Sequence, residues 1–447
     1  MKILLSISVI LLLTGCGGKN ISYDDAVEST LKKENLNQPQ KFKSVVDNGN
    51  VNKGWIKDLN DEKLEKLVNE SLQNNRQIRS LQAQVQRSNA LVKQVASQLK
   101  PTVGIGAEYS SKNVLGFDEI YGGGLNASWE ADIWGRLDAS VSSVTQSAAA
   151  TQSDYEFARQ SLVASTAKAW YMNTTSKLQK NYAKSVMDIK EKVLKVVNAK
   201  YDVGQVGMRD VHLAKADLLK SKDAYSKAQA AYENSQRGLE LLLGRYPSAE
   251  VESANKLIGI TTSIPSGIPS QLLSRRPDIV AAEQRVAAAF YKQKEAELLH
   301  LPRFTFSIGA SVNNLTNAIA NLGAGVFAPL YTGGAIEAEV EVANAVQKQS
   351  IEQYAQKALE AFKEVETLLS LEEKLQDQES YLRDVVKENT KALEMTKALF
   401  EVGKIDYLEV SQIDNRLIGS EVALLDISNK RVFNRISLYL ALGGGFE

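Results

Sequence analysis

The chain has 447 residues, with 53 Lys or Arg and 53 Asp or Glu, so its formal net charge at pH 7 is zero. There is no surplus of positive charge that would favour nucleic acid as a partner. The single cysteine excludes an internal disulfide framework, and a chain of this length is long enough for more than one core.

The N-terminus has the pattern of a secretory signal peptide. Lys2 supplies positive charge, and the apolar residues 3–13 are fewer than the roughly 20 that a transmembrane helix needs. Residues 13–16, Leu-Thr-Gly-Cys, resemble the bacterial lipobox, in which cleavage precedes the cysteine and its thiol is lipidated, for example with palmitate. We therefore expect a lipoprotein signal peptide at residues 1–15, lipidation of Cys16 and a lipidated segment at 16–60. The alternative is a chance cysteine behind a signal peptide.

Landmarks in the first half of the chain recur in the same order in the second half. Each half has a proline before a strand, a glycine after the second strand, a Val-Gly pair after a long helix and a closing Leu-Gly pair. Both halves predict a helix, a strand pair, a very long helix, a turn and a long helix. We divide the mature chain into a first repeat at residues 61–260 and a second repeat at 261–447.

The predicted helices are unusually long. No proline occurs between Pro101 and Pro247 or after Pro329, and residues 136–203 are mostly compatible with a helix. At 1.5 Å per residue this segment would reach about 100 Å. Five apolar residues follow coiled-coil spacing: Leu368, Leu371, Leu375, Leu382 and Val385. An ordinary coiled-coil rod is the alternative interpretation of the helices.

Four segments alternate between apolar and polar residues, as strands with one apolar face do. They cover residues 102–110, 121–134, 303–312 and 321–330, and each is close to the 9–11 residues that cross a bilayer as a tilted strand. No segment after residue 13 is apolar enough for a transmembrane helix, so any crossing must use these strands. Aromatic residues at their ends could lie at the membrane interfaces: Tyr109, Tyr121, Trp129, Trp134 and Tyr331.

Four strands cannot close a barrel within one chain. An open sheet edge in lipid leaves unpaired backbone groups that cost several kcal/mol each, and single-chain barrels begin at about eight strands. A membrane-spanning sheet must therefore close by oligomerisation. The alternative is two soluble hairpins at the end of a coiled coil.

Three motifs resemble the TolC-like outer-membrane factor family, in particular its lipoprotein branch, which serves RND-type efflux systems. Residues 272–283, LLSRRPDIVAAE, resemble the signature that opens the second repeat, and residues 129–136 and 328–334 resemble the exits from the second strands into the long helices. In the signature, Pro277 and Asp278 also suit the first turn of a helix.

The resemblance implies an α+β membrane protein. Three protomers, with four strands each, would form a trimeric 12-stranded outer-membrane β-barrel, continued by a long α-helical barrel in the periplasm. It implies a passive exit duct for small molecules such as antibiotics. The partners would be a periplasmic adaptor (membrane fusion) protein, an inner-membrane RND-type transporter and outer-membrane lipid.

The same resemblance places the periplasmic mouth of the duct at two helix–helix turns, residues 203–211 and 402–410. Polar links between neighbouring hairpins would keep the mouth closed, and an acidic ring would lie at its narrowest point. Gln412 stands where many members carry Asp, so a double acidic ring is in question. We expect positive φ angles at the turn glycines, Gly204, Gly207 and Gly403. The implied gate residues are Arg209, Asp210, Asp406, Leu408, Glu409 and Gln412.

The residues that carry most catalytic and metal chemistry are scarce. His212 and His300 lie far apart, and neither has a partner at metal-ligand spacing. The carboxylates of Glu130 and Asp132 fit a barrel lumen better than an acid–base pair. We therefore expect no catalytic site, no bound metal and no cofactor.

Three alternatives to the efflux duct remain at this point. The same fold would serve a type I secretion system that exports protein or peptide. A structural coiled-coil lipoprotein of the periplasm would have the helices without the channel. An envelope enzyme would need a nucleophile with its base or a metal shell, and the sequence shows neither.

Overall fold

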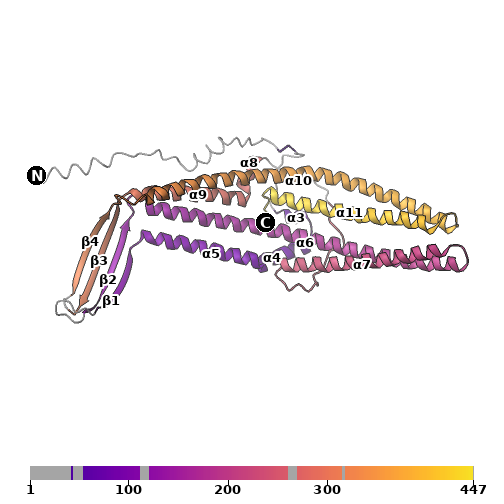
Figure 1. The fold of residues 1–447 in the computed structure, drawn as a ribbon, viewed down its shortest axis with the longest axis horizontal. Helices are drawn as coiled ribbons and strands as arrows, with labels where there is room; N and C mark the ends of the chain where they lie inside the picture. Colours follow the sequence, from indigo (N-terminus) through magenta and orange to yellow (C-terminus); the bar gives the residue numbers. More distant parts are fainter. Residues whose placement is uncertain (1–41, 44–53, 111–119, 260–268, 315–317, 446–447) are drawn as a thin grey trace. The chain divides into compact units, whose positions relative to one another are not determined.

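The computed structural model describes residues 42–43, 54–110, 120–259, 269–314 and 318–445. Cys16 and the signal peptide lie outside the described residues. The chain forms two compact units (Figure 1). The first contains described residues 88–150 and 282–357, and the second contains 42–87, 151–281 and 358–445 except for the gaps given above.

The described residues form long helices and one sheet, which lies in the first unit. In chain order the elements are α3 (Trp55–Asp58), α4 (Glu62–Asn74), α5 (Arg76–Ala96), η2 (Ser97–Leu99), β1 (Thr102–Ser110), β2 (Ile120–Ala131), α6 (Arg136–Asp202), α7 (Met208–Leu242), α8 (Pro269–Arg275), α9 (Pro277–Glu297), η3 (Leu298–His300), β3 (Arg303–Asn313), β4 (Ile319–Phe327), α10 (Ala335–Glu401) and α11 (Tyr407–Ala441). The predicted order of elements in each half is confirmed. No helix within the described ranges is both long and apolar enough to cross a membrane.

The first unit contains a four-stranded antiparallel sheet with the order β1-β2-β3-β4. The central pairing of β2 with β3 joins the two halves of the chain, with Trp129 opposite Phe306. Those two rings stack at a centroid distance of 6.1 Å. Among the described residues, β1 and β4 each have one edge without a strand partner in the sheet.

Two predicted strand ends are wrong. β2 ends at Ala131, three residues before the predicted end, because the chain turns toward α6 with Gly135 at a φ of 75°. β4 covers Ile319–Phe327 instead of ending at residue 330. Pro329 lacks the N–H that a strand pairing needs, which explains the early end.

The apolar side chains of the sheet lie on one face and are widely exposed in the protomer. Val103 is 75% exposed, Ile105 85% and Leu322 86%. Water-exposed apolar area of this extent marks a face that lipid or another protein covers. Trp129 donates its indole N–H to the carbonyl of Leu99 at 3.0 Å, and Trp134 donates to that of Pro302 at 2.8 Å. These bonds fasten the junctions between strands and helices.

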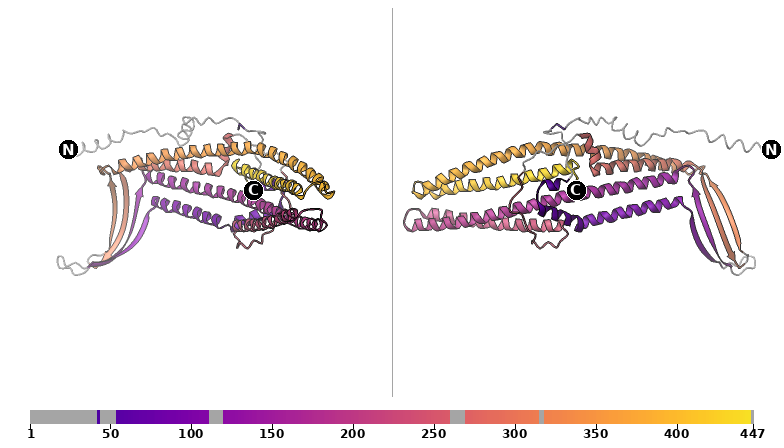
Figure 2. Two further views of the ribbon diagram at one scale, coloured as in Figure 1. Left: turned by 45° about the vertical axis from the view of Figure 1, so that its right-hand side comes forward. Right: turned by 180° about the vertical axis from the view of Figure 1, so that it is seen from behind.

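The second unit contains two helical hairpins, made by α7 with the later part of α6 and by α11 with the later part of α10 (Figure 2). The expected coiled-coil spacing in α10 is correct only in part. Leu375 is buried, but Leu371 and Val385 are exposed in the protomer. The buried residues before Leu375 include Ala358, Ala361, Val365 and Leu369, at steps of three and four, whereas Leu368 and Leu382 are half-buried.

Candidate functional site

The two hairpin turns have nearly identical backbones. Gly204 and Gly403 have φ angles of 73° and 75°, in the left-handed region that glycine enters at little cost. In both turns the N–H of the next residue reaches back five residues, from Gln205 to Lys200 and from Lys404 to Leu399. Both helices therefore end in the same left-handed cap.

Gly207 differs from the other two turn glycines, and the expectation of a positive φ is wrong for it. Its φ is −88° and its ψ is 164°, an extended conformation that precedes α7 as its N-cap. The Asp210 carboxylate accepts a hydrogen bond from the Gly207 N–H at 3.3 Å. An N-cap needs extended backbone, which explains the difference.

Arg209 and Asp406 connect the two turns. Arg209 donates a hydrogen bond to the Asp406 carboxylate, and the two residues come from different hairpins of the same protomer. This hydrogen bond and the negative charge of Asp406 raise the pKa of Arg209. Both side chains are more than half exposed. An ion pair at the surface contributes little stability and is readily broken.

Of the other implied gate residues, Asp210 also lies within ion-pair distance of Arg209. Asp210 is buried, where it caps α7, and its carboxylate is 3.7 Å from Arg209. Leu408, Glu409 and Gln412 are exposed in the first turns of α11. Glu409 and Gln412 are three residues apart, so they share one side of the helix.

A buried ion cluster lies farther along the hairpins, and the sequence analysis missed it. The Lys190 ammonium on α6 is 2.7 Å from Asp414 on α11 and 3.6 Å from Asp217 on α7. Its side chain is only 4% exposed. Asp217 also accepts hydrogen bonds from the hydroxyls of Tyr407 at 3.0 Å and Ser411 at 2.5 Å. Five side chains from three helices thus hold the two hairpins together.

Apolar residues form a buried core between this cluster and the turns. Val197, Ala214, Leu393, Tyr407 and Val410 form a buried core between the hairpins. Burial, followed by the nearby charge of Asp217, raises the pKa of the Tyr407 hydroxyl, so it remains a hydrogen-bond donor at neutral pH. The contacts near the hairpin turns therefore combine an exposed ion pair with a buried core and buried charges.

The signature at residues 272–283 builds a second buried ion network. α9 begins at Pro277 as expected. Arg276 donates to both carboxylate oxygens of Asp278, at 3.0 and 2.9 Å, to Glu364 at 2.7 Å and to the Ala441 carbonyl at 3.2 Å. Arg276 is 5% exposed. The motif thus fastens the start of α9 to α10 and to the end of α11, which the sequence analysis did not anticipate.

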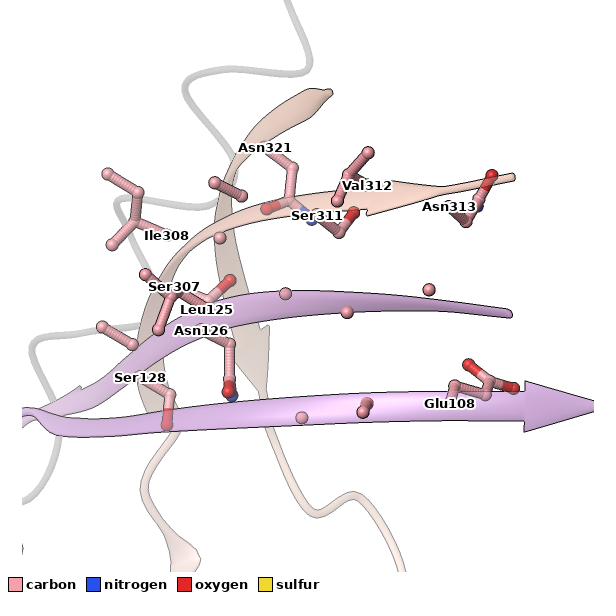
Figure 3. A pocket seen from close by; sticks show the side chains of 18 residues that line it. Glu108, Leu125, Asn126, Ser128, Ser307, Ile308, Ser311, Val312, Asn313 and Asn321 are labelled. Atoms are coloured by element: carbon pink, nitrogen blue, oxygen red, sulfur yellow. The ribbon is translucent and has the colours of Figure 1, made fainter. Parts of the chain in front are cut away.

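The polar face of the sheet is the remaining candidate for contact with a transported molecule. It forms a hollow of about 650 Å³, lined by residues of all four strands (Figure 3). Asn126, Ser128, Ser307 and Asn321 are among its polar side chains. Glu130, expected on the polar face, accepts a hydrogen bond from Arg136 at 2.7 Å. The described residues include no group of three His, Cys, Asp or Glu side chains that could hold a metal ion.

The model of the outer membrane efflux protein family matches residues 67–245 and 268–444. This chain belongs to that family. The cation efflux system protein CusC of Escherichia coli K12 is 28% identical over 464 residues, covering 99% of both chains. The pyoverdine export outer membrane protein OpmQ of Pseudomonas aeruginosa is 24% identical and covers 100% of this chain and 98% of OpmQ. A crystal structure of CusC superimposes with a TM-score of 0.82 at 26% identity, covering 91% of this chain and 97% of that one.

The protomer therefore has the fold of the trimeric outer membrane efflux channels. Its four strands are a share of the outer-membrane barrel, and its long helices belong to the periplasmic tunnel. The chain is the outer-membrane exit duct of an efflux system, located in the outer membrane with its tunnel in the periplasm.

Proposed function

We propose that three copies of this chain close one duct, which exports small organic molecules in a tripartite pump with a periplasmic adaptor and an inner-membrane RND-type transporter. The observation that carries this proposal is the sheet with its two unpaired edges at β1 and β4. A sheet in lipid must pair every strand edge, and three protomers with four strands each give one closed ring. The duct itself performs no chemistry.

Small organic cargo fits the composition of the chain better than metal ions do. The chain has two His, five Met and one Cys. Soft metal ions are bound by thiolate, thioether and imidazole groups, which are scarce here. The names of CusC and OpmQ attach cation efflux to one relative and pyoverdine export to the other, so relatives of similar identity carry different cargo.

We propose that the turns of the two hairpins form the gate. Arg209 and Asp406 would hold the turns together at rest. The buried cluster of Lys190, Asp217 and Asp414 would hold the same hairpins together farther from the turns. Three copies of the exposed Glu409 would give an acidic ring that favours cations. An adaptor that binds the turns would break the exposed ion pair of Arg209 and Asp406 first, because an exposed ion pair contributes little to stability.

Cys16 would carry the acyl chains that hold the N-terminus in the outer membrane. The barrel would provide a second attachment to the membrane besides these acyl chains. We also keep the division into a lipidated segment at 16–60 and repeats at 61–260 and 261–447 as a proposal.

Accumulation of a fluorescent dye and a panel of antibiotics tests the proposed function. The measurement compares a strain that lacks this gene with the same strain after the gene is restored. We expect accumulation to rise on deletion and to fall again on restoration. Unchanged accumulation over a broad panel would contradict small-molecule export and favour secretion of protein or peptide.

A further inference from the structure

Polar side chains on the hollow face of the sheet lie against glycines of the neighbouring strand. The Asn126 side-chain oxygen is 3.2 Å from the place where a Cβ on Gly104 would be, and Ser307 Oγ is 2.6 Å from the corresponding place at Gly323. The Asn321 oxygen occupies the space of a Cβ at Gly309. Each glycine is the register partner of the residue that covers it. The polar groups therefore lie along this face of the sheet, in space that a Cβ on each glycine would fill.

Two of these pairs form one row across the whole sheet. Gly104 pairs with Asn126, Asn126 with Gly309, and Gly309 with Asn321, so glycine and asparagine alternate over the four strands. Figure 3 labels Asn126 and Asn321. One protomer contributes two carboxamides to this row. Three protomers, as proposed above, would place six carboxamides around the barrel at one level.

The two rows next to the row of Asn126 and Asn321 contain no charged side chain. The row next to it on one side contains Ser128 and Ser307, and the row on the other side contains Gly106 and Ser311. In the described strands, the closest charged residue on this face along β1 is Glu108, and on β2 it is Glu130, which is paired with Arg136. A belt three rows deep thus offers hydroxyl and carboxamide groups without a fixed charge.

Channels that select ions by charge do so with rings of charged side chains, which this belt lacks. A carboxamide both donates and accepts hydrogen bonds, so it suits cations, anions and neutral polar molecules equally. We propose that Asn126 and Asn321 keep the barrel wall from selecting cargo by charge, so that hydrogen-bonding organic molecules of either charge sign can pass the barrel. This inference rests on the proposed function.

An isosteric change of the carboxamides tests the proposal. The double variant N126D/N321D adds two carboxylates per protomer with almost no change in volume. The purified full-length protein is recorded in planar bilayers under a KCl gradient at about 0.01 M salt, where the Debye length is about 30 Å. We expect the permeability ratio of cation to anion to rise about twofold or more, because six carboxylates would act across the lumen at this screening length.

Two further variants make the result decisive. N255D adds one exposed carboxylate per protomer outside the sheet and should leave the ratio at the wild-type value. G106D places a carboxylate on the polar face where no atom lies within 4 Å of the new Cβ, so it serves if the double variant fails to fold. It should raise the ratio in the same direction.

The possible failures are distinguishable. Channels that form normally in the Asp variants but keep the wild-type permeability ratio would overturn the role of the belt and leave the proposed function intact. A wild-type protein that forms no channel would overturn the proposed function, and this inference with it.

Discussion

Arg209 on α7 donates a hydrogen bond to Asp406, the N-cap of α11, and so ties the turns of the two hairpins within one protomer. The two residues are 197 positions apart in the chain. Behind this exposed contact, Lys190 lies between Asp217 and Asp414 with little access to water. The contacts between the hairpins therefore become more buried, and more costly to break, away from the turns.

Neutralising the charges at the turns should open the duct. We expect R209A and E409Q to raise single-channel conductance in planar bilayers, because R209A removes the link to Asp406 and E409Q removes a charged group from the polar links proposed to keep the mouth closed. The control is K227Q, which breaks an exposed ion pair with Asp223 on α7. Conductance in both gate variants equal to that of the control would end the gate proposal for these residues.

Removing the buried ammonium should destabilise the hairpins. K190M would leave the carboxylates of Asp217 and Asp414 without their cation, and breaking a buried ion pair by removing one partner costs about 3–5 kcal/mol. We expect a lower melting temperature in detergent and faster proteolysis near the turns. The double variant K190M/D414N should recover part of the loss.

A matched lysine on the same helix provides the control for this experiment. Lys195 forms an exposed pair with Glu191 at 3.5 Å, so K195Q should change stability little. A melting temperature of K190M equal to that of K195Q would mean that the cluster does not hold the hairpins together.

Glu240 predicts an acid-dependent loss of stability. Burial by itself would raise its pKa, but the N–H groups of Ala249, Glu250 and Val251 donate to its carboxylate at 2.8, 2.7 and 3.0 Å, and the net effect lowers the pKa. A carboxylate whose pKa is lower in the folded state stabilises the fold above its unfolded pKa of about 4.3. That contribution is lost as the pH falls through the folded pKa.

Melting temperatures of wild type and E240Q against pH measure this contribution. We expect E240Q to be less stable by about 1–3 kcal/mol at pH 7, because one amide oxygen replaces two charged acceptors. The difference should shrink below about pH 4. A difference that stays constant down to pH 3 would show that the charge of Glu240 is not its source.

Lipidation depends on one residue, since Cys16 is the only cysteine. Cells grown with labelled palmitate should label the wild-type protein and not C16A. We expect C16A still to reach the outer membrane fraction, because the barrel strands remain. Palmitate label on C16A would contradict the assignment of Cys16.

The elements were predictable because their patterns are local. Alternation at residues 102–110 matches β1, and the absence of proline after Arg136 matches the helix that ends at Asp202. The predicted ends of β2 and β4 were wrong near Gly135 and Pro329, because backbone conformation and not the side-chain pattern sets the end of the strand there. Tertiary pairing was not predictable in this way. Lys190 meets its partners on two other helices, and no spacing in one segment indicates such a contact.

The residues of the two hairpin turns could be predicted only from the resemblance to the family. It placed Arg209 and Asp406 in the two turns, and the structure brings them together. Asp210, also expected among the gate links, is buried, caps α7 and lies 3.7 Å from Arg209. Asp210 lies three residues after Gly207, and this spacing within the sequence is typical of a side chain that caps the start of a helix.

We infer that one protomer is an incomplete barrel that three copies close. β1 and β4 each leave one edge open in the sheet, so the duct depends on assembly. The most direct measurement is the native mass of the full-length protein extracted from the outer membrane in a mild detergent. We expect the mass of three lipidated protomers, and we expect this trimer to be stable without partner proteins. A monomeric mass under the same conditions would contradict it.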